Sequence, residues 1–213
     1  TVNPTAGLIT TEAGRTACFR GDEASFTVVL NSQPSADVTI GLSSSDTTEG
    51  TVSPTALTFT TVNWNTAQTI TITGVDDAIV DGDVAYTINT AAATSVDANY
   101  NDINPTDVSV TNTDNDSAGI TVNPTSGLIT TEAGDITTFT VVLNSQPAAN
   151  VIIPVTSDDT TEGTVSPASL TFTPVNWNTA QTITLTGVND GIVDGDQPYT
   201  VQVEPAESTD AHY

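Results

Sequence analysis

Polar and apolar residues alternate along several short stretches of this chain. The clearest stretch is Thr69-Ile70-Thr71-Ile72-Thr73, in which every second side chain is apolar. A period of two indicates a β-strand with one buried face. Turn signals such as Asn31-Ser32-Gln33-Pro34 separate these stretches, and together they predict seven strands in the first half of the chain. We expect the strands near residues 2–11, 24–31, 36–44, 56–60, 67–75, 83–90 and 106–113.

The same pattern occurs twice. Residues 1–5 return as 121–125, at an offset of 120, and residues 26–100 return as 139–213, at an offset of 113. The first copy therefore holds seven extra residues. Each copy has the usual size of one β-sandwich domain. We predict an all-β chain of two tandem immunoglobulin-like antiparallel sandwiches of about seven strands each. The expected domains are residues 1–116 and 117–213.

Alternating strand direction would bring the acidic loops of the first copy together. In an antiparallel sandwich every second loop lies at the same end. The loops after the first, third and fifth strands, and the segment after the seventh, should therefore meet at one pole. Nine carboxylates would converge there: Glu12, Asp46, Glu49, Asp76, Asp77, Asp81, Asp83, Asp114 and Asp116.

The chain has few basic residues that could neutralise such a pole. It carries 26 acidic residues against two Arg and no Lys, so its net charge is −24. Ca²⁺ accepts six to eight oxygen ligands in flexible geometry, whereas Mg²⁺ demands a strict octahedron. Zinc and copper favour His or Cys, and the chain holds only His212 and Cys18, in different copies. Ca²⁺ is the expected cofactor. The alternative is that the acidic loops are solvated turns that keep the protein soluble.

Several motifs resemble the Calx-β domain family, which includes tandem repeats of bacterial surface proteins. They are Thr11-Glu12-Ala13-Gly14, Val75-Asp76-Asp77, Asp81-Gly82-Asp83, Asn63-Trp64-Asn65 and the closing Thr113-Asp114-Asn115-Asp116. The resemblance implies a seven-strand sandwich with Ca²⁺ at its distal pole. The implied ligands of the first copy are Glu12, Asp46, Asp76, Asp77, Asp81, Asp83, Asp114 and Asp116. Those of the second copy are Glu132, Asp158, Asp159, Asp190, Asp194 and Asp196.

The second copy departs from this pattern. Asn189 stands where the first copy has Asp76, which removes one charge. The repeat reaches Tyr213 without a counterpart of the strand expected near 106–113. We expect that strand to come from a continuation of the chain or from a neighbouring subunit by β-augmentation. The chain also begins inside a strand-like segment, so we expect a fragment or a mature product.

The seven-residue insertion carries both Arg residues and the single Cys. It creates Arg20-Gly21-Asp22, a tripeptide that some integrins bind. A plainer interpretation is an elongated loop whose arginines pair with nearby carboxylates. Cys18 has no cysteine partner in the chain, so an intramolecular disulfide is excluded.

Other function classes fit the sequence less well. The negative charge repels nucleic acid and anionic membranes, and no apolar run is long enough to span a bilayer. No catalytic constellation stands out, because the one His has Asn99 as its counterpart. We expect a non-enzymatic, calcium-stiffened repeat of an extracellular or cell-surface stalk, fibre or adhesin, with further copies as partners and self-assembly. The alternative is an adhesin module that binds a glycan or host protein, with Trp64 and Trp177 as platforms.

Overall fold

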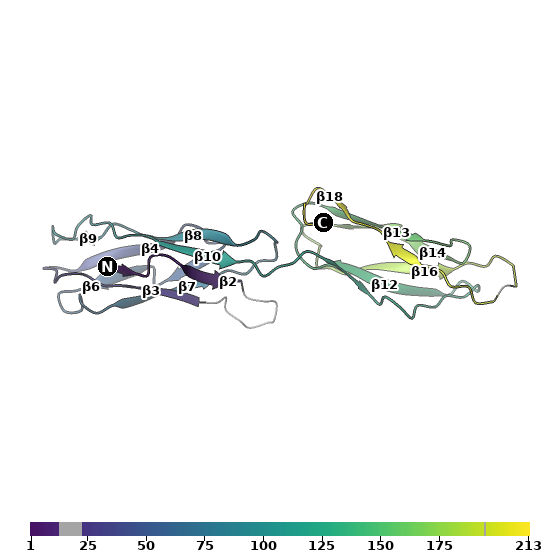
Figure 1. Cartoon of the computed structure of the whole chain (residues 1–213), viewed down its shortest axis with the longest axis horizontal. Helices are drawn as coiled ribbons and strands as arrows, with labels where there is room; N and C mark the ends of the chain where they lie inside the picture. Colours follow the sequence, from purple (N-terminus) through teal and green to yellow (C-terminus); the bar gives the residue numbers. More distant parts are fainter. Residues whose placement is uncertain (13–22, 194) are drawn as a thin grey trace. The chain divides into compact units, whose positions relative to one another are not determined.

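The computed structural model describes residues 1–12, 23–193 and 195–213. Over these residues the chain forms strands joined by turns and loops, and it contains no helix (Figure 1). Accordingly, none of the described segments is a helix that could cross a membrane. The predicted all-β fold of two tandem sandwiches is confirmed.

The chain divides into two compact units. Unit 1 comprises Thr1–Asp77 and Asp81–Asn115, and unit 2 comprises Ala78–Val80 and Asp116–Tyr213. Each unit has its own hydrophobic core. Each is described below by itself.

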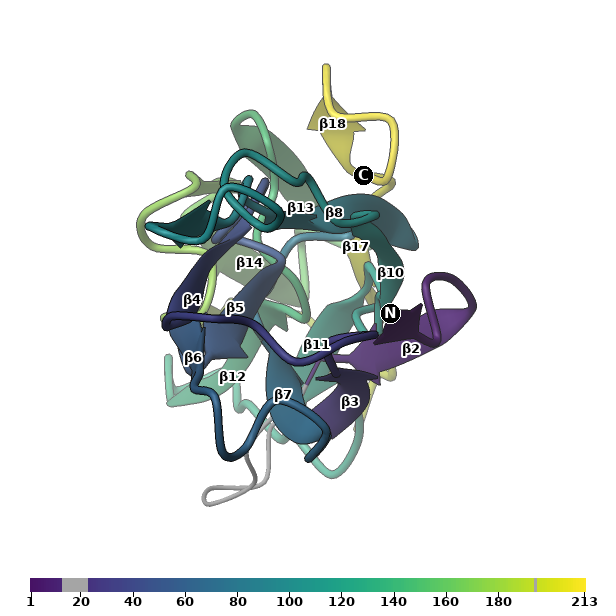
Figure 2. The ribbon, with the colours of Figure 1, turned by 90° about the vertical axis from the view of Figure 1, so that its left-hand side faces the viewer.

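Unit 1 consists of two facing sheets. Its strands are β1 (Val2–Asn3), β2 (Leu8–Thr11), β3 (Glu23–Val28), β4 (Val38–Ser44), β5 (Gly50–Ser53), β6 (Ala56–Phe59), β7 (Gln68–Gly74), β8 (Val84–Thr90), β9 (Thr94–Ser95) and β10 (Val108–Thr113). One sheet has the order β1-β3-β7-β5, and the other has the order β2-β10-β8-β4-β6 with β9 paired to β4. Figure 2 views these strands nearly end-on, with β3 beside β7 and β8 beside β10.

Alternation along the strands builds the core of unit 1. In β7, Ile70 and Ile72 are fully buried, while the alternating threonines Thr69, Thr71 and Thr73 face away from the core. In β10, Val108 and Val110 are buried by the same alternation. Each fully buried aliphatic side chain contributes about 1.5–3 kcal/mol. The apolar positions of the sequence pattern are thus the ones that hold the two sheets together.

The prediction of a single first strand near residues 2–11 is wrong. The segment splits into β1, which pairs antiparallel with β3, and β2, which pairs parallel with β10. Pro4 lies between them and has no backbone N–H, so the first ladder ends there. The sandwich is therefore not antiparallel throughout. Because β2 runs parallel to β10, Glu12 at the end of β2 lies beside the end of β10.

The short strand β5, from which the chain crosses to the other sheet, was also not predicted. The expected strand near 56–60 corresponds to β6, which pairs with β4. Before it, β5 pairs with β7 in the opposite sheet, and Pro54 lies at the crossing. The alternation of β5 covers only four residues, too few to separate it from a loop by pattern alone.

Unit 2 repeats this architecture with fewer strands. Its strands are β11 (Ile120–Asn123), β12 (Ile136–Leu143), β13 (Val151–Ser157), β14 (Gly163–Ser166), β15 (Ser169–Phe172), β16 (Gln181–Gly187), β17 (Val201–Val203) and β18 (Glu207–Ser208). One sheet has the order β11-β12-β16-β14, and the other has the order β15-β13-β17 with β18 paired to β13. Its core centres on Phe172, Ile153 and Ile183, which are fully buried.

Candidate metal centre

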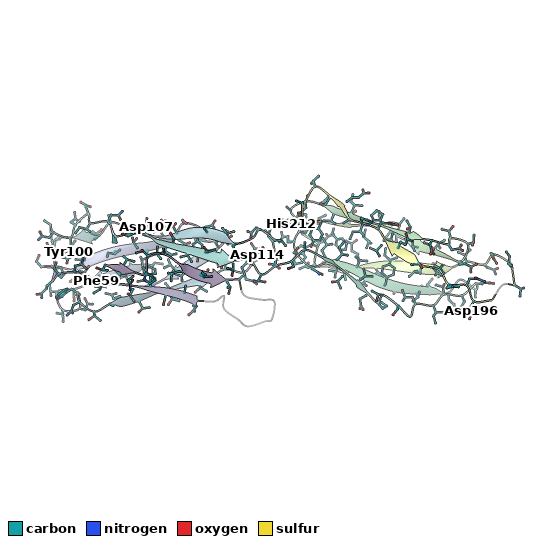
Figure 3. All side chains as sticks on the ribbon, in the orientation of Figure 1. Phe59, Tyr100, Asp107, Asp114, Asp196 and His212 are labelled. Atoms are coloured by element: carbon teal, nitrogen blue, oxygen red, sulfur yellow. The ribbon has the colours of Figure 1, made fainter. Side chains whose placement is uncertain are left out.

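The loops of unit 1 carry their acidic residues to one end of the sandwich. Strand pairing fixes the direction of each strand: β3 and β5 both run antiparallel to β7, and β8 runs antiparallel to both β4 and β10. The β4–β5 loop, the β7–β8 loop, the end of β2 and the end of β10 therefore lie at one pole. Figure 3 shows Asp114 at this end of unit 1 and Tyr100 at the other. We call the nine carboxylates of these loops, of the end of β2 and of the segment after β10 the acidic pole; eight of them belong to unit 1, and Asp116 is counted with unit 2.

Three carboxylates of the acidic pole approach one another closely. Glu12, Asp114 and Asp116 each offer an oxygen that lies within 4.8 Å of the other two, and this is the one such group among the residues that the structure describes. The Glu12 backbone N–H donates to Thr113 O at 3.2 Å and so extends the parallel pairing of β2 and β10 by one residue. The Asn115 N–H donates to Glu12 Oε2 at 3.3 Å. Backbone geometry thus positions these side chains. We call these three residues the carboxylate triad.

The triad is shielded from solvent. Glu12 is 5% exposed, and Asp114 and Asp116 are half-buried. Two unit charges 4.8 Å apart repel by roughly 3.5 kcal/mol at an effective dielectric constant of about 20. The two arginines, Arg15 and Arg20, lie outside the described residues.

The β7–β8 loop is hydrogen-bonded to the triad. Asp83 Oδ1 accepts from the Asp114 N–H at 3.2 Å, and Asp114 Oδ2 accepts from the Gly82 N–H at 2.8 Å. Gly82 adopts φ +77°, a left-handed conformation that suits glycine. Asn115 Nδ2 donates to Asp76 Oδ1 at 3.1 Å. Asp83 is thus hydrogen-bonded to a triad residue, and Asp76 to the residue between Asp114 and Asp116.

A buried hydrogen-bond network lies behind the pole. Asn112 is 1% exposed and Glu49 is 6% exposed. Asn112 Nδ2 donates to Val75 O at 3.0 Å and to Glu49 Oε2 at 3.4 Å. Asn112 Oδ1 accepts from Thr10 Oγ1 at 2.9 Å. This one amide connects β10 to β2, to the start of the β7–β8 loop and to the end of the β4–β5 loop.

Carboxylate crowding is visible in the pKa values of the pole. Loss of solvent raises the pKa of Glu49, the Asn112 hydrogen bond opposes this, and repulsion from Asp81, Asp46 and Asp77 adds to it. Loss of solvent also raises the pKa of Asp81, with further repulsion from Asp77 and Asp114.

Asp46 behaves differently from its neighbours. Hydrogen bonds from the side chain and backbone of Thr48 lower the pKa of Asp46. Its carboxylate closes a local turn at the start of the β4–β5 loop. The structure therefore places Asp46 at the pole in a turn-forming role.

The predicted ligands of the second copy are not gathered in the same way. Glu132 is exposed, unlike its counterpart Glu12. Asp158 Oδ1 accepts from the Thr200 N–H at 2.6 Å, and Asp159 closes a turn with Thr161.

The remaining predicted ligands of unit 2 lie in the β16–β17 loop. Asp190 Oδ1 accepts from the Ile192 N–H at 2.8 Å. Asp196 is exposed, and Figure 3 shows it at the end of unit 2 opposite His212. Asp194 is outside the described residues. Over the part of unit 2 that is described, no strand occupies the place that β10 has in unit 1, and β10 is the strand that carries Asp114.

The predicted ligand-binding residues differ in their burial. Trp177 is 8% exposed and packs in the core of unit 2, so the prediction that it offers a platform to a sugar ring is wrong. Trp64 is half-buried against the core of unit 1. Arg20, Gly21 and Asp22 lie outside the described residues.

The roles of two residues at or beside the acidic pole were not predicted from the sequence. Glu49 was placed at the pole but not among the ligands, although it is buried beside Asn112. Asn112 was not predicted to have a role. The available signal was the alternation of β10: Asn112 follows Val108 and Val110 on the buried side of the strand, where an apolar residue is expected.

Chemically, the pole offers hard oxygen donors and little else. Carboxylates come from the β4–β5 loop, the β7–β8 loop and the ends of β2 and β10, and backbone carbonyls and water can complete a coordination sphere of six to eight oxygens. The described residues of the pole contain neither His nor Cys, the ligands that zinc and copper favour. The donor set fits Ca²⁺.

Comparison with known proteins gives a distant likeness to solved structures. No protein-family model matches the chain, and no curated protein matches it significantly. The chain is similar to CBD12 from CALX1.2, at 17% identity over 100% of this chain and 83% of that chain, with a TM-score of 0.41. It is similar to the calcium binding domain CBD12 of CALX1.1, at 18% identity over 96% and 79%, with a TM-score of 0.41. It is also similar to the periplasmic chaperone SfaE, at 11% identity over 98% and 97%, with a TM-score of 0.40. Likeness of this degree assigns neither a family nor a ligand to the chain.

Proposed function

We propose that this chain is a Calx-β-like, calcium-binding structural repeat of an extracellular stalk, fibre or adhesin. The observation that carries the proposal is the carboxylate triad, whose oxygens lie within 4.8 Å of one another. Bound Ca²⁺ would convert the repulsion among Glu12, Asp114 and Asp116 into attraction and so stabilise unit 1.

The triad would supply the first ligands, and the loop acids would complete the site. Asp76 and Asp83 already contact Asn115 and Asp114. Asp77 and Asp81 lie close enough to Glu49 to raise its pKa. The ion would therefore join the ends of β2 and β10 to the β7–β8 loop.

The proposed location is extracellular, where calcium is abundant enough to occupy a weak site. Calcium modules outside cells bind with Kd of about 10⁻⁴ to 10⁻³ M, and we expect a site with ligands on an exposed loop to lie in this range. Asp76, Asp77, Asp81 and Asp83 are all exposed. Tandem copies of one module also suit a stalk, in which each copy contacts its neighbours.

The proposed role is structural rather than catalytic. The chain has one His and one Cys, so a repeated site cannot use either residue in both copies. Trp177 belongs to a core, which removes one of the two aromatic residues on which the glycan alternative depended.

Thermal unfolding with added cations tests the proposal. A single site stabilises by about 2.7 kcal/mol at a calcium concentration of one hundred times Kd, which corresponds to a Tm rise on the order of 10 °C for a domain of this size. We expect Ca²⁺ to raise the unfolding temperature of unit 1 and EDTA to reverse the rise, with Mg²⁺ giving a smaller shift. Superimposable curves in Ca²⁺ and EDTA would contradict the proposal.

A further inference from the structure

Three acidic side chains are buried in the part of the chain that the structure describes: Glu12, Glu49 and Asp97. A buried carboxylate is costly unless hydrogen bonds or an opposite charge compensate it. Glu12 belongs to the carboxylate triad, where the proposed compensation is calcium. Glu49 and Asp97 are equally buried, each at 6% exposed, but their surroundings differ.

Hydrogen bonds compensate the charge of Asp97. Its carboxylate accepts from the backbone N–H of Ser35 at 2.7 Å and from that of Asn99 at 2.9 Å. The Asn99 side chain donates to it at 3.1 Å. These bonds hold the pKa of Asp97 at about 2 although the side chain is buried. Asp97 therefore needs no further ligand.

The Glu49 carboxylate is compensated far less. Among the described residues it accepts one hydrogen bond, from Asn112 Nδ2, which lies 3.4 Å from Glu49 Oε2. The same amide nitrogen donates to Val75 O at the shorter distance of 3.0 Å. Glu49 Oε1 accepts no hydrogen bond from any residue that the structure describes. A buried carboxylate with one long hydrogen bond is expected to bind a further partner.

The backbone fixes the place of this carboxylate. Glu49 O accepts from the Val75 N–H at 2.9 Å, and the next residue, Gly50, pairs with Gly74 at the end of β7. The Tyr86 hydroxyl packs against Gly50 so closely that a Cβ atom there would overlap it. The end of the β4–β5 loop is thus held against the start of the β7–β8 loop.

The Glu49 carboxylate faces the acids of the β7–β8 loop. Loss of solvent raises its pKa, the Asn112 hydrogen bond opposes this, and repulsion from Asp81, Asp46 and Asp77 adds to it. Asp77 and Asp81 are themselves exposed on their loop. A hard divalent cation between Glu49 and this loop would compensate the buried charge and neutralise the loop acids together.

We infer that Glu49 is a metal ligand, which binds calcium together with Asp77 and Asp81 from the buried side of the acidic pole. This assignment deepens the proposed function and rests on it, because it requires that the pole binds calcium. Calcium affinity depends on the charge of the ligands and on the rigidity of the site. Glu49 adds both, since its backbone is already fixed before the ion binds.

Two substitutions distinguish a ligand from a structural residue. Glu49→Gln keeps the size of the side chain and an acceptor for Asn112, but it removes the charge. In EDTA it should leave Tm unchanged or raise it, because an uncompensated buried charge is gone. Calcium affinity, measured by isothermal titration calorimetry of the whole chain, should fall at least about ten-fold.

Glu49→Asp keeps the charge on a shorter side chain. Its calcium affinity should lie between that of the native chain and that of Glu49→Gln. A merely structural role predicts the opposite order, because the shorter side chain disturbs the contact with Asn112 and the glutamine does not.

Asp97→Asn is the matched control, because Asp97 is as buried as Glu49 and its partner Ser35 lies in the β3–β4 loop, at the other end of unit 1. It should lower Tm in EDTA at neutral pH and leave calcium affinity unchanged. The inference is overturned if Glu49→Gln binds calcium as tightly as the native chain, or more tightly than Glu49→Asp. Calcium binding by the native chain would then still support the proposed function. Failure of the native chain to bind calcium would overturn both.

Discussion

Neutralising one carboxylate of the triad should have opposite effects with and without calcium. Glu12→Gln preserves the shape of a side chain that is 5% exposed and removes its charge. Without Ca²⁺ the variant loses two repulsive pairs. With Ca²⁺ it loses a charged ligand. The change therefore separates a metal site from a merely acidic surface.

The size of the effect follows from the spacing. Each pair lies within 4.8 Å, and at that limit its repulsion is roughly 3.5 kcal/mol at an effective dielectric constant of about 20. Water around the half-buried Asp114 and Asp116 screens much of this, so we expect a net gain of about 1–3 kcal/mol in EDTA. Such a gain raises Tm by at least about 4 °C for a domain of this size. In Ca²⁺, the calcium-induced rise in Tm should shrink.

Differential scanning calorimetry measures both effects in one set of samples. The matched control is Asp37→Asn, because Asp37 is exposed at the opposite end of unit 1. This control should leave Tm and its calcium response nearly unchanged. If Glu12→Gln lowers Tm in EDTA and leaves the calcium response intact, then the triad is neither repulsive nor a metal site.

Three further predictions address other parts of the molecule. Backbone N–H groups of Ser35 and Asn99 donate to Asp97 and hold its pKa at about 2. The stabilisation by this charge is therefore present above about pH 4 and is lost as pH falls toward 2. Asp97→Asn should make Tm fall less steeply between pH 5 and pH 2.5. Asn112→Ala should lower both Tm and calcium affinity measured by titration, since it leaves Thr10 Oγ1 and Val75 O without this partner. Calcium should narrow the distribution of interatomic distances from small-angle scattering, because an ion held by Asp114 and Asp116 restricts the link before β11. An unchanged distribution would refute this.

Local pattern was enough to predict most strands. β7 was expected from Thr69-Ile70-Thr71-Ile72-Thr73 because alternation depends only on neighbouring residues. The gathering of acidic loops at one pole was also predictable, because the end at which a loop lies depends on how often the chain reverses direction. β1 and β2 run in one direction, as do β5 and β6, so the two missed divisions leave the loops at the same ends. The β7–β8 loop and the end of β10 meet for this reason.

Long-range pairing could not be predicted in the same way. The division of the first strand into β1 and β2, and the parallel pairing of β2 with β10, depend on which sheet each half joins. The burial of Glu12 follows from that pairing, so its sequence-identical counterpart Glu132 can be exposed. Trp177 was misjudged for a similar reason: a loop residue in sequence can still pack into a core.

Isothermal titration calorimetry of the whole chain with Ca²⁺ tests the central claim most directly, when the chain is compared with its Glu12→Gln, Asp114→Asn double variant. We expect saturable binding by the native chain, with Kd in the range of about 10⁻⁴ to 10⁻³ M or tighter, and loss of that binding in the double variant. Equal binding by both chains, or no saturable binding by the native chain, would contradict the claim that this pole is a calcium site.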